Sequence, residues 1–270
     1  MRRRTGEGRR VLWVYNFPTW VFTCLTVTAM CSIACLGHLL ARRYLPIGDL
    51  VKGNSVAGFI IGIIGTAYAV LLSFMVVVVW QQFDGSDGNT AVEAGAASDL
   101  HHLCDSFPRP LGTRMKSELD EYVSLMIGAE WPAMQKGGWS PRAQGLSRLI
   151  ERQVADFAPK TSGQSNLQAQ ALAEVRTLLD ARRRRLHDNE TGIPRILWWT
   201  LWAVACVTIG FSYFFGLENV RIQMIMTAAL TSTIALIFVL IAELDYPFRG
   251  QTSISPHSWY QVQRQLHSDH

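Results

Sequence analysis

The chain has 270 residues, of which 49% are hydrophobic and 17% are charged, with a formal net charge of +4. Soluble globular proteins carry about 25% charged residues, so this composition argues against an ordinary soluble enzyme, and the low net charge argues against a disordered chain. Five cysteines and 21 glycines do not fit a disulfide scaffold or a collagen. The mean hydropathy of +0.14 predicts a chain divided between membrane and water.

Four long apolar runs contain no Asp, Glu, Lys or Arg. They are Trp20–Ala41, Val56–Trp80, Ile196–Leu217 and Ile222–Ala242, with 22, 25, 22 and 21 residues. A membrane-spanning helix needs about 20 apolar residues, and the runs lack the alternation of β-barrel strands. The sequence therefore predicts an all-α protein with four transmembrane helices, of which the last two form a hairpin.

The flanking Lys and Arg residues are distributed unequally, with eleven on the side of the termini and four on the other side. The eleven are Arg2, Arg3, Arg4, Arg9, Arg10, Arg182, Arg183, Arg184, Arg185, Arg195 and Arg249, and the four are Arg42, Arg43, Lys52 and Arg221. By the positive-inside rule, both termini are expected to be cytoplasmic. A cleaved signal peptide is an alternative for the first run, although that run is longer than a usual signal-peptide core.

A polar segment separates the second and third runs, and its apolar residues recur at helical spacing. Between residues 83 and 194 it holds 13 Lys and Arg against 15 Asp and Glu, which argues against nucleic-acid binding. We expect a mobile end over residues 261–270. The predicted organisation is a basic N-terminus (1–19), two spans (20–82), a helical cytoplasmic domain (83–195), two spans (196–243) and a cytoplasmic C-terminal tail (244–270).

No phosphate-binding glycine loop, nucleophile elbow or metalloprotease motif is present, so no catalytic residue is predicted and the chain is not expected to be an enzyme. His101, Cys104 and Asp105 share one helix face and are weighed as zinc ligands, but a polar helix face explains them as well. Glu118, Asp120 and Glu121 form an acidic run that is typical of a solvated surface. We predict no metal and no cofactor.

The second run carries a stripe of small residues. Its members are Gly58, Gly62, Gly65, Thr66, Ala69 and Ser73. One interpretation is a GxxxG-type face against which another helix packs. The other is the wall of a pore, which needs no intramembrane charge because a hydrophobic constriction can gate by dewetting. Both interpretations stay open in a ring of helices.

Two charged groups flank the later spans. The arginines Arg182–Arg185 are interpreted either as a positive-inside anchor or, in an oligomer, as a cluster that attracts anions to a cytoplasmic entrance. Glu243 and Asp245 follow the fourth run, and we predict a structural ion pair or helix-end contact for them.

Several stretches resemble the bacterial bestrophin-like family of uncharacterised membrane proteins. The matching stretches are Gly65–Phe74, Glu93–Ala94, Glu130–Pro132, Arg182–Leu186 and Leu244–Gly250. Within them, the residues interpreted as a structural motif are Glu93, Glu130, Trp131, Asp245, Pro247, Phe248 and Gly250. Trp80 and Phe83 resemble the Trp-x-Gln-aromatic end of the second bestrophin span.

The resemblance implies a multi-pass protein of a bacterial inner membrane, in which copies of the chain form a homopentameric pore for inorganic anions. The implied pore-lining residues are Gly62, Thr66, Ala69, Val70 and Ser73, with Trp80 and Phe83 at the inner end of the pore. Bestrophins have an aromatic and aliphatic neck, whereas the corresponding positions here hold no aromatic residue, and no calcium clasp is recognised. The alternative is a non-conducting scaffold or sensor whose cytoplasmic helices bind a protein partner.

Overall fold

The computed structural model describes residues 18–44, 47–217 and 219–268, so most of the predicted basic N-terminus lies outside the described residues. The described residues are helical and contain no strand, as the sequence predicts. The chain divides into two compact units. We call Met1–Gln81 with Ile193–Asp245 the membrane unit, and Gln82–Gly192 with Tyr246–His270 the helical unit.

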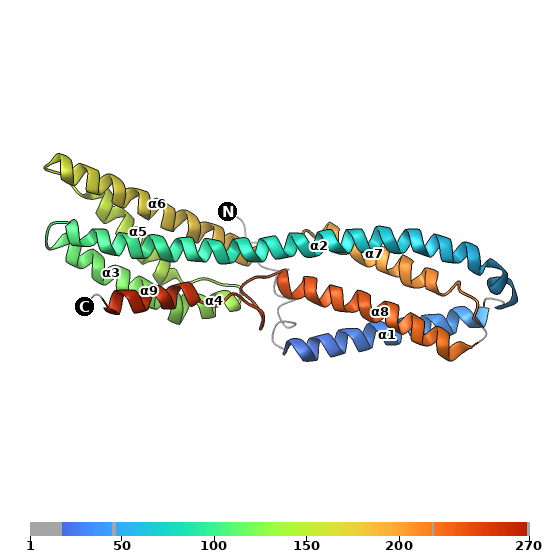
Figure 1. Ribbon diagram of the computed structural model, residues 1–270. Helices are drawn as coiled ribbons and strands as arrows, with labels where there is room; N and C mark the ends of the chain where they lie inside the picture. Colours follow the sequence, from blue (N-terminus) through green and yellow to red (C-terminus); the bar gives the residue numbers. More distant parts are fainter. Residues whose placement is uncertain (1–17, 45–46, 218, 269–270) are drawn as a thin grey trace, which may run out of the picture. The chain divides into compact units, whose positions relative to one another are not determined.

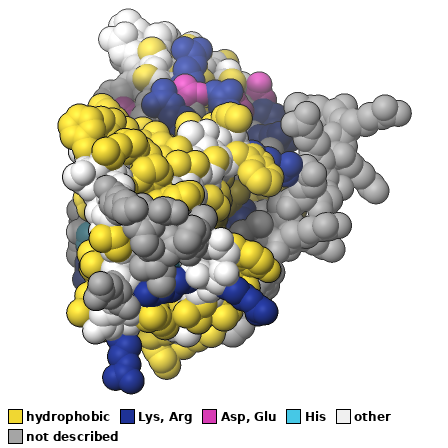
Figure 2. Space-filling model, turned by 90° about the vertical axis from the view of Figure 1, so that its right-hand side faces the viewer, with side chains coloured by type: hydrophobic (Ala, Val, Ile, Leu, Met, Phe, Trp, Pro, Cys, Tyr) yellow, Lys and Arg dark blue, Asp and Glu magenta, His cyan; other side chains and the backbone are white. Residues whose placement is uncertain are grey.

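The membrane unit contains four helices that are long and apolar enough to cross a bilayer. Its elements are α1 (Thr19–Tyr44), the first part of α2 (Ile47–Leu103), α7 (Arg195–Ser212) and α8 (Val220–Leu244). Helices α1 and α8 lie side by side, and α7 packs against both (Figure 1). Hydrophobic side chains, with Lys and Arg among them, cover much of the surface shown in Figure 2. The prediction of four membrane-spanning helices is confirmed.

The C-terminal ends of α2 and α7 differ from the prediction. Helix α2 does not stop near Trp80 but continues as one helix of 57 residues to Leu103. Ser86 and Thr90 are buried, and their hydroxyls donate to the carbonyls four residues earlier at 2.8 and 3.0 Å. This burial keeps the segment helical despite the intrinsic cost of its two glycines. Helix α7 ends at Ser212, five residues before the end of the apolar run.

The helical unit is built from the end of α2 and shorter helices. These are η2 (Cys104–Ser106), α3 (Leu111–Leu125), η3 (Met126–Glu130), α4 (Trp131–Gln135), α5 (Pro141–Asp156), α6 (Ser162–Glu190) and α9 (His257–Ser268). Ser140 caps α5 and Thr161 caps α6, each by accepting a backbone N–H three residues later. The cap at Thr161 starts α6 six residues before the start expected near Gln168.

The core of the helical unit brings together residues that are distant in sequence. Tyr122, Trp131 and Trp259 belong to one buried cluster, and Leu100 and Met115 belong to another. The ring of Trp259 packs edge-on against that of Tyr122, with centroids 5.7 Å apart. Helix α9 is therefore a structural part of this unit.

The prediction of a mobile end is wrong for residues 261–268. Trp259, Val262 and Leu266 recur at helical spacing on α9, and all three side chains are buried. Three apolar residues among polar ones are a weak signal in a short segment. Their burial depends on a surface supplied by other helices, and residues 269–270 lie outside the described chain.

Replacing Trp259 with alanine tests the role of α9. We expect Trp259→Ala to lower the free energy of unfolding by about 3–5 kcal/mol, because it leaves a large cavity in the core. Urea unfolding of the purified chain, followed by circular dichroism, measures this loss. Tyr260→Ala is the matched control, since Tyr260 is 47% exposed. Equal effects of the two substitutions would contradict the packed position of α9.

Candidate functional site

Among the described residues, the membrane-spanning part of α2 is buried along one edge. Tyr68, Leu72, Met75 and Val79 recur every three to four residues, and all four are at least 95% buried. The Tyr68 hydroxyl donates to the carbonyl oxygen of Leu201 on α7 at 3.3 Å. This edge therefore fixes α2 to the other helices of the membrane unit.

The predicted pore-lining residues lie on the side of α2 that the chain leaves uncovered. At about 100° per residue, their mean direction lies about 135° around the helix from that of the buried edge. All five, namely Gly62, Thr66, Ala69, Val70 and Ser73, are exposed. A Cβ atom added at Gly62 or Gly65 would have no neighbouring atom within 4 Å. No described part of the chain covers the stripe at Gly62, Thr66, Ala69 and Ser73.

The stripe is only weakly polar, although it contains two hydroxyl groups. Thr66 donates to the carbonyl of Gly62, and Ser73 donates to the carbonyl of Ala69, both at 2.8 Å. Because the helix backbone uses both hydroxyl protons, the stripe has few donors to offer an ion. At the end of the stripe, Trp80 is exposed, whereas Phe83 is half-buried against the core of the helical unit.

A buried cluster of opposite charges lies in the helical unit. Arg185 on α6 donates two hydrogen bonds, of 2.6 and 3.0 Å, to the carboxylate of Glu93 on α2. Arg182, one turn earlier, lies 2.8 Å from Glu130 of η3, and Arg185 lies 3.5 Å from the same carboxylate. The Tyr122 hydroxyl donates to Glu93 at 2.8 Å. We call these five residues the arginine–glutamate cluster.

Burial makes the ionic state of this cluster decisive for stability. The side chains of Arg185, Glu93 and Glu130 are 0% exposed. Burial by itself opposes the charged form of Arg185, but Glu93 and Glu130 outweigh it and raise the pKa of Arg185 above its ordinary value. Burial, followed by the charge of Glu93, raises the pKa of Tyr122, so its phenol stays protonated and acts as a donor.

Other motif residues surround the cluster. The Trp131 ring lies 5.2 Å from the Arg185 guanidinium carbon, and its other neighbour is Phe248, with ring centroids 5.7 Å apart. Trp131 also donates through Nε1 to the carbonyl of Ile254 at 2.9 Å. Glu130 accepts the backbone N–H of Ser140 at 2.8 Å. These contacts join α4, α6 and the segment after α8 around one set of charges.

Pro247 and Gly250 fix the backbone of the segment that follows α8. The Pro247 carbonyl accepts the Ile254 N–H at 2.8 Å, and Gly250 has a positive φ of 78°, which a glycine adopts without strain. In the membrane unit, Asp245 follows the last residue of α8 and accepts the backbone N–H of Ile193 at 2.5 Å. Glu243 accepts the hydroxyl of Thr19 at 3.3 Å.

The four consecutive arginines divide into two pairs. Arg182 and Arg185 are three residues apart, face the core and belong to the arginine–glutamate cluster. Arg183 and Arg184 are exposed, and Arg183 pairs with Asp180 on the surface. The sequence identifies Glu93 and Glu130 as motif residues but does not predict that they pair with Arg182 and Arg185. A glutamate directly before the apolar Trp131 was one signal that Glu130 could be buried. Tyr122 gave no signal of its own.

The residues considered for zinc do not form a metal site in the described part of the chain, where no three His, Cys, Asp or Glu side chains come together as ligands. His101 is buried, with Nε2 3.3 Å from an Asp120 oxygen. Burial lowers the pKa of His101 despite that carboxylate. Burial also raises the pKa of Cys104 to about 12, so its thiol remains protonated.

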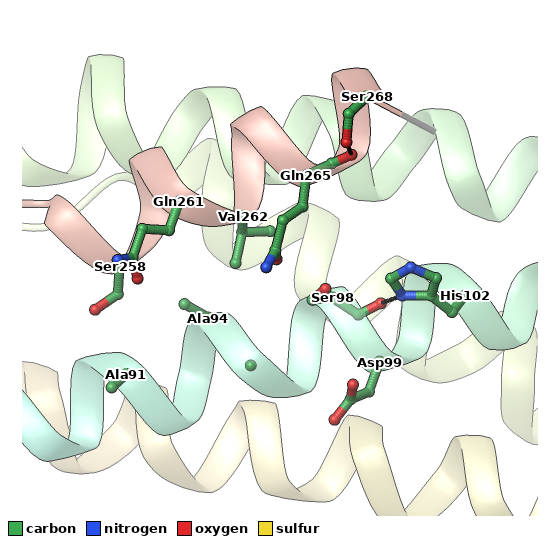
Figure 3. Close-up of a pocket in the computed structure, with 11 residues that line it drawn as sticks. Ala91, Ala94, Ser98, Asp99, His102, Ser258, Gln261, Val262, Gln265 and Ser268 are labelled. Atoms are coloured by element: carbon green, nitrogen blue, oxygen red, sulfur yellow. Dashed lines mark hydrogen bonds between the residues drawn. The ribbon is translucent and has the colours of Figure 1, made fainter. Parts of the chain in front are cut away.

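A groove of about 580 Å³ runs between α2 and α9 within the helical unit (Figure 3). Ala91, Ala94 and Gly95 give it a floor of small residues, and Gln261 and Gln265 line it from α9. The Nδ1–H of His102 donates to the Ser98 carbonyl, 2.8 Å away. The groove offers amide and hydroxyl groups and carries one carboxylate, that of Asp99.

Comparison with known proteins identifies relatives of this chain. A family model described as a bestrophin-like domain matches residues 28–259. A mutant form of a bacterial bestrophin homologue from Klebsiella pneumoniae has a TM-score of 0.67 at 12% identity, covering 90% of this chain and 98% of that one. A structure of this homologue solved by zinc phasing gives 0.63 at 13% identity, covering 92% and 97%. No curated protein matches.

The arginine–glutamate cluster predicts a sharp difference between neighbouring arginines. Arg185→Met leaves Glu93 buried without its main counter-charge, so we expect a loss of about 3–5 kcal/mol in the free energy of unfolding. Arg184→Met changes an exposed side chain, and we expect less than about 0.5 kcal/mol. Urea unfolding followed by tryptophan fluorescence measures both. Similar losses for the two variants would show that the cluster is not the source.

His101 predicts loss of stability in acid. Its pKa lies below the ordinary imidazole value of about 6.5 in the folded state, so the unfolded chain binds more protons as the pH falls through 6.5. Unfolding free energies at two pH values should therefore fall less for His101→Gln than for the wild type. His102→Gln, at an exposed position, is the control and should follow the wild type. A wild-type pH dependence in His101→Gln would refute this assignment.

Proposed function

This chain belongs to the bestrophin-like family, and from that premise we propose that it is a homo-oligomeric membrane protein whose α2 helices surround an anion pore. The fold likeness to a bacterial bestrophin homologue supports this proposal over most of both chains. The five proposed pore-lining residues are Gly62, Thr66, Ala69, Val70 and Ser73, and the proposed assembly is a pentamer in a bacterial inner membrane with both termini in the cytoplasm.

The observation that carries the proposal is the uncovered, uncharged side of α2. A stripe of small side chains that only lipid touched would expose much helix backbone for no packing gain. In a ring of copies this side would face a central passage, because each α2 then contributes one wall to it. The hydroxyls of Thr66 and Ser73 are used by the backbone, so such a passage would conduct by being wide enough to stay wet.

Selectivity for anions is proposed on the distribution of charge. The apolar run of α2 contains no acidic residue that would repel an anion. Arg183 and Arg184 remain exposed on α6, and we assign the attraction of inorganic anions to this outer pair. The inner pair, Arg182 and Arg185, is buried together with its carboxylate partners and contributes to stability instead.

A second candidate function is a non-conducting scaffold that binds a protein partner through the helical unit. The groove between α2 and α9 favours this candidate, because its amide and hydroxyl groups suit a polar peptide surface. The two candidates differ in stoichiometry and flux. A ring of copies viewed along the membrane normal supports the pore, whereas a monomer or dimer in detergent supports the scaffold.

Halide flux into liposomes tests the pore directly. We expect the purified chain to conduct, and Ala69→Trp to reduce the flux at least about tenfold, because an indole would fill the passage at the stripe. Ile33→Trp is the matched control, since Ile33 is 70% exposed on α1, and it should conduct like the wild type. Size-exclusion profiles confirm that both variants assemble. Absence of wild-type flux, or equal flux in both variants, would contradict the pore.

A further inference from the structure

Three side chains from three helices hold the connection between α7 and α8. Asn54 of α2 donates to the Gly216 carbonyl and accepts the Gly216 N–H, both at 2.9 Å. Arg42 of α1 donates to the Leu217 carbonyl at 2.9 Å, and the side-chain amide of Gln223 on α8 donates to the Phe215 carbonyl. We call Arg42, Asn54 and Gln223 the loop clamp. Without it, carbonyl groups would lack partners at the edge of the membrane, at a cost of several kcal/mol each.

A buried histidine lies against the loop clamp. His38 is 1% exposed, and neither of its ring nitrogens meets hydrogen-bond geometry with another group. It precedes Arg42 by one helical turn, so both side chains share one face of α1. A buried polar group without a partner is unusual and calls for a functional explanation.

The surroundings of His38 fix its environment tightly. The Tyr213 ring packs edge-on against the imidazole at 5.6 Å, and the Tyr213 hydroxyl donates to the Ala34 carbonyl at 2.9 Å. Gly37 permits this approach, because a Cβ there would come within 2.8 Å of the Tyr213 hydroxyl. The end of α7 therefore rests directly on the turn of α1 that carries His38.

No described carboxylate is positioned to balance a charge on His38. Its polar neighbours are the Arg42 guanidinium, one turn along its own helix, and the Gln223 amide from α8, which lies 3.3 Å from Arg42. From α7 it meets the Tyr213 hydroxyl, beside which Cys35 also lies. A proton on His38 would place a second cation one turn from Arg42, in a region from which water is largely excluded.

We propose that His38 is an acid-sensitive release for the loop clamp. At neutral pH the uncharged imidazole lets Arg42 donate to Gln223 Oε1, 3.3 Å away, and to the loop. When an imidazole nitrogen takes a proton from water, the imidazolium repels Arg42 and competes as a donor for the same amide oxygen. The contacts to Gly216 and Leu217 then open, and residues 215–217 lose the contacts that hold them. This release does not depend on anion conduction.

Hydrogen exchange of the full chain in detergent tests the release. Backbone amides over residues 213–223 are compared at about pH 8 and about pH 5.5, which bracket the ordinary imidazole pKa, after correction for intrinsic exchange. We expect wild-type protection to be up to about tenfold lower in acid, because pH 5.5 lies about one unit below the ordinary imidazole pKa. His38→Gln, which keeps a polar side chain but cannot take the proton, should stay within about twofold.

His101→Gln supplies the matched control, because it removes the other imidazole that is buried in the described part of the chain, in the helical unit. The loop of this variant should lose protection in acid as the wild type does. His38→Phe keeps an aromatic ring of similar size against Tyr213 and replaces His38→Gln if that variant does not fold. Equal wild-type protection at both pH values, or wild-type loss in a His38 variant, would overturn the proposal.

Discussion

The pairing of two arginines with two glutamates in a dry core is the interaction on which the helical unit depends. Arg185 and Glu93 join α6 to α2, and Arg182 and Glu130 join α6 to η3. A single unpaired charge at such a depth would cost several kcal/mol, so each helix must hold its charged residue in place for the others to stay folded. The ring of Trp131 closes the cluster and extends the constraint to the segment that follows α8.

Helix α2 carries this constraint and the candidate pore side within one unbroken element. Glu93 lies in its second part, and the small-residue stripe lies in its first part. Each part buries one edge against its own unit, through Tyr68 and Leu72 in the membrane unit and through Ala94 and Ala97 in the helical unit. The small-residue side of the first part has no partner among the described residues. That asymmetry is what an oligomer around a central passage requires of its wall.

The fold was largely predictable, because apolar length and helical periodicity are local properties of the sequence. The four spans, the start of α5 at Pro141 and the inward-facing Leu119 and Val175 all follow from them. Helix α9 was not predictable, since Trp259, Val262 and Leu266 become a core face only when other helices supply the surface beneath them. The continuation of α2 past Trp80 was missed for a similar reason, as buried Ser86 and Thr90 outweigh the intrinsic preference of the nearby glycines.

The sequence by itself determined the membrane character of the chain, its four helices and its family resemblance, because hydrophobic runs and short motifs are written directly in residue order. Only the tertiary structure decided which charges face each other. Four identical arginines in a row gave no way to tell that Arg182 and Arg185 turn inward to carboxylates while Arg183 and Arg184 meet solvent. It also decided that His38 is enclosed beside Arg42, because enclosure depends on Tyr213 and Gln223, which reach it from helices far along the chain.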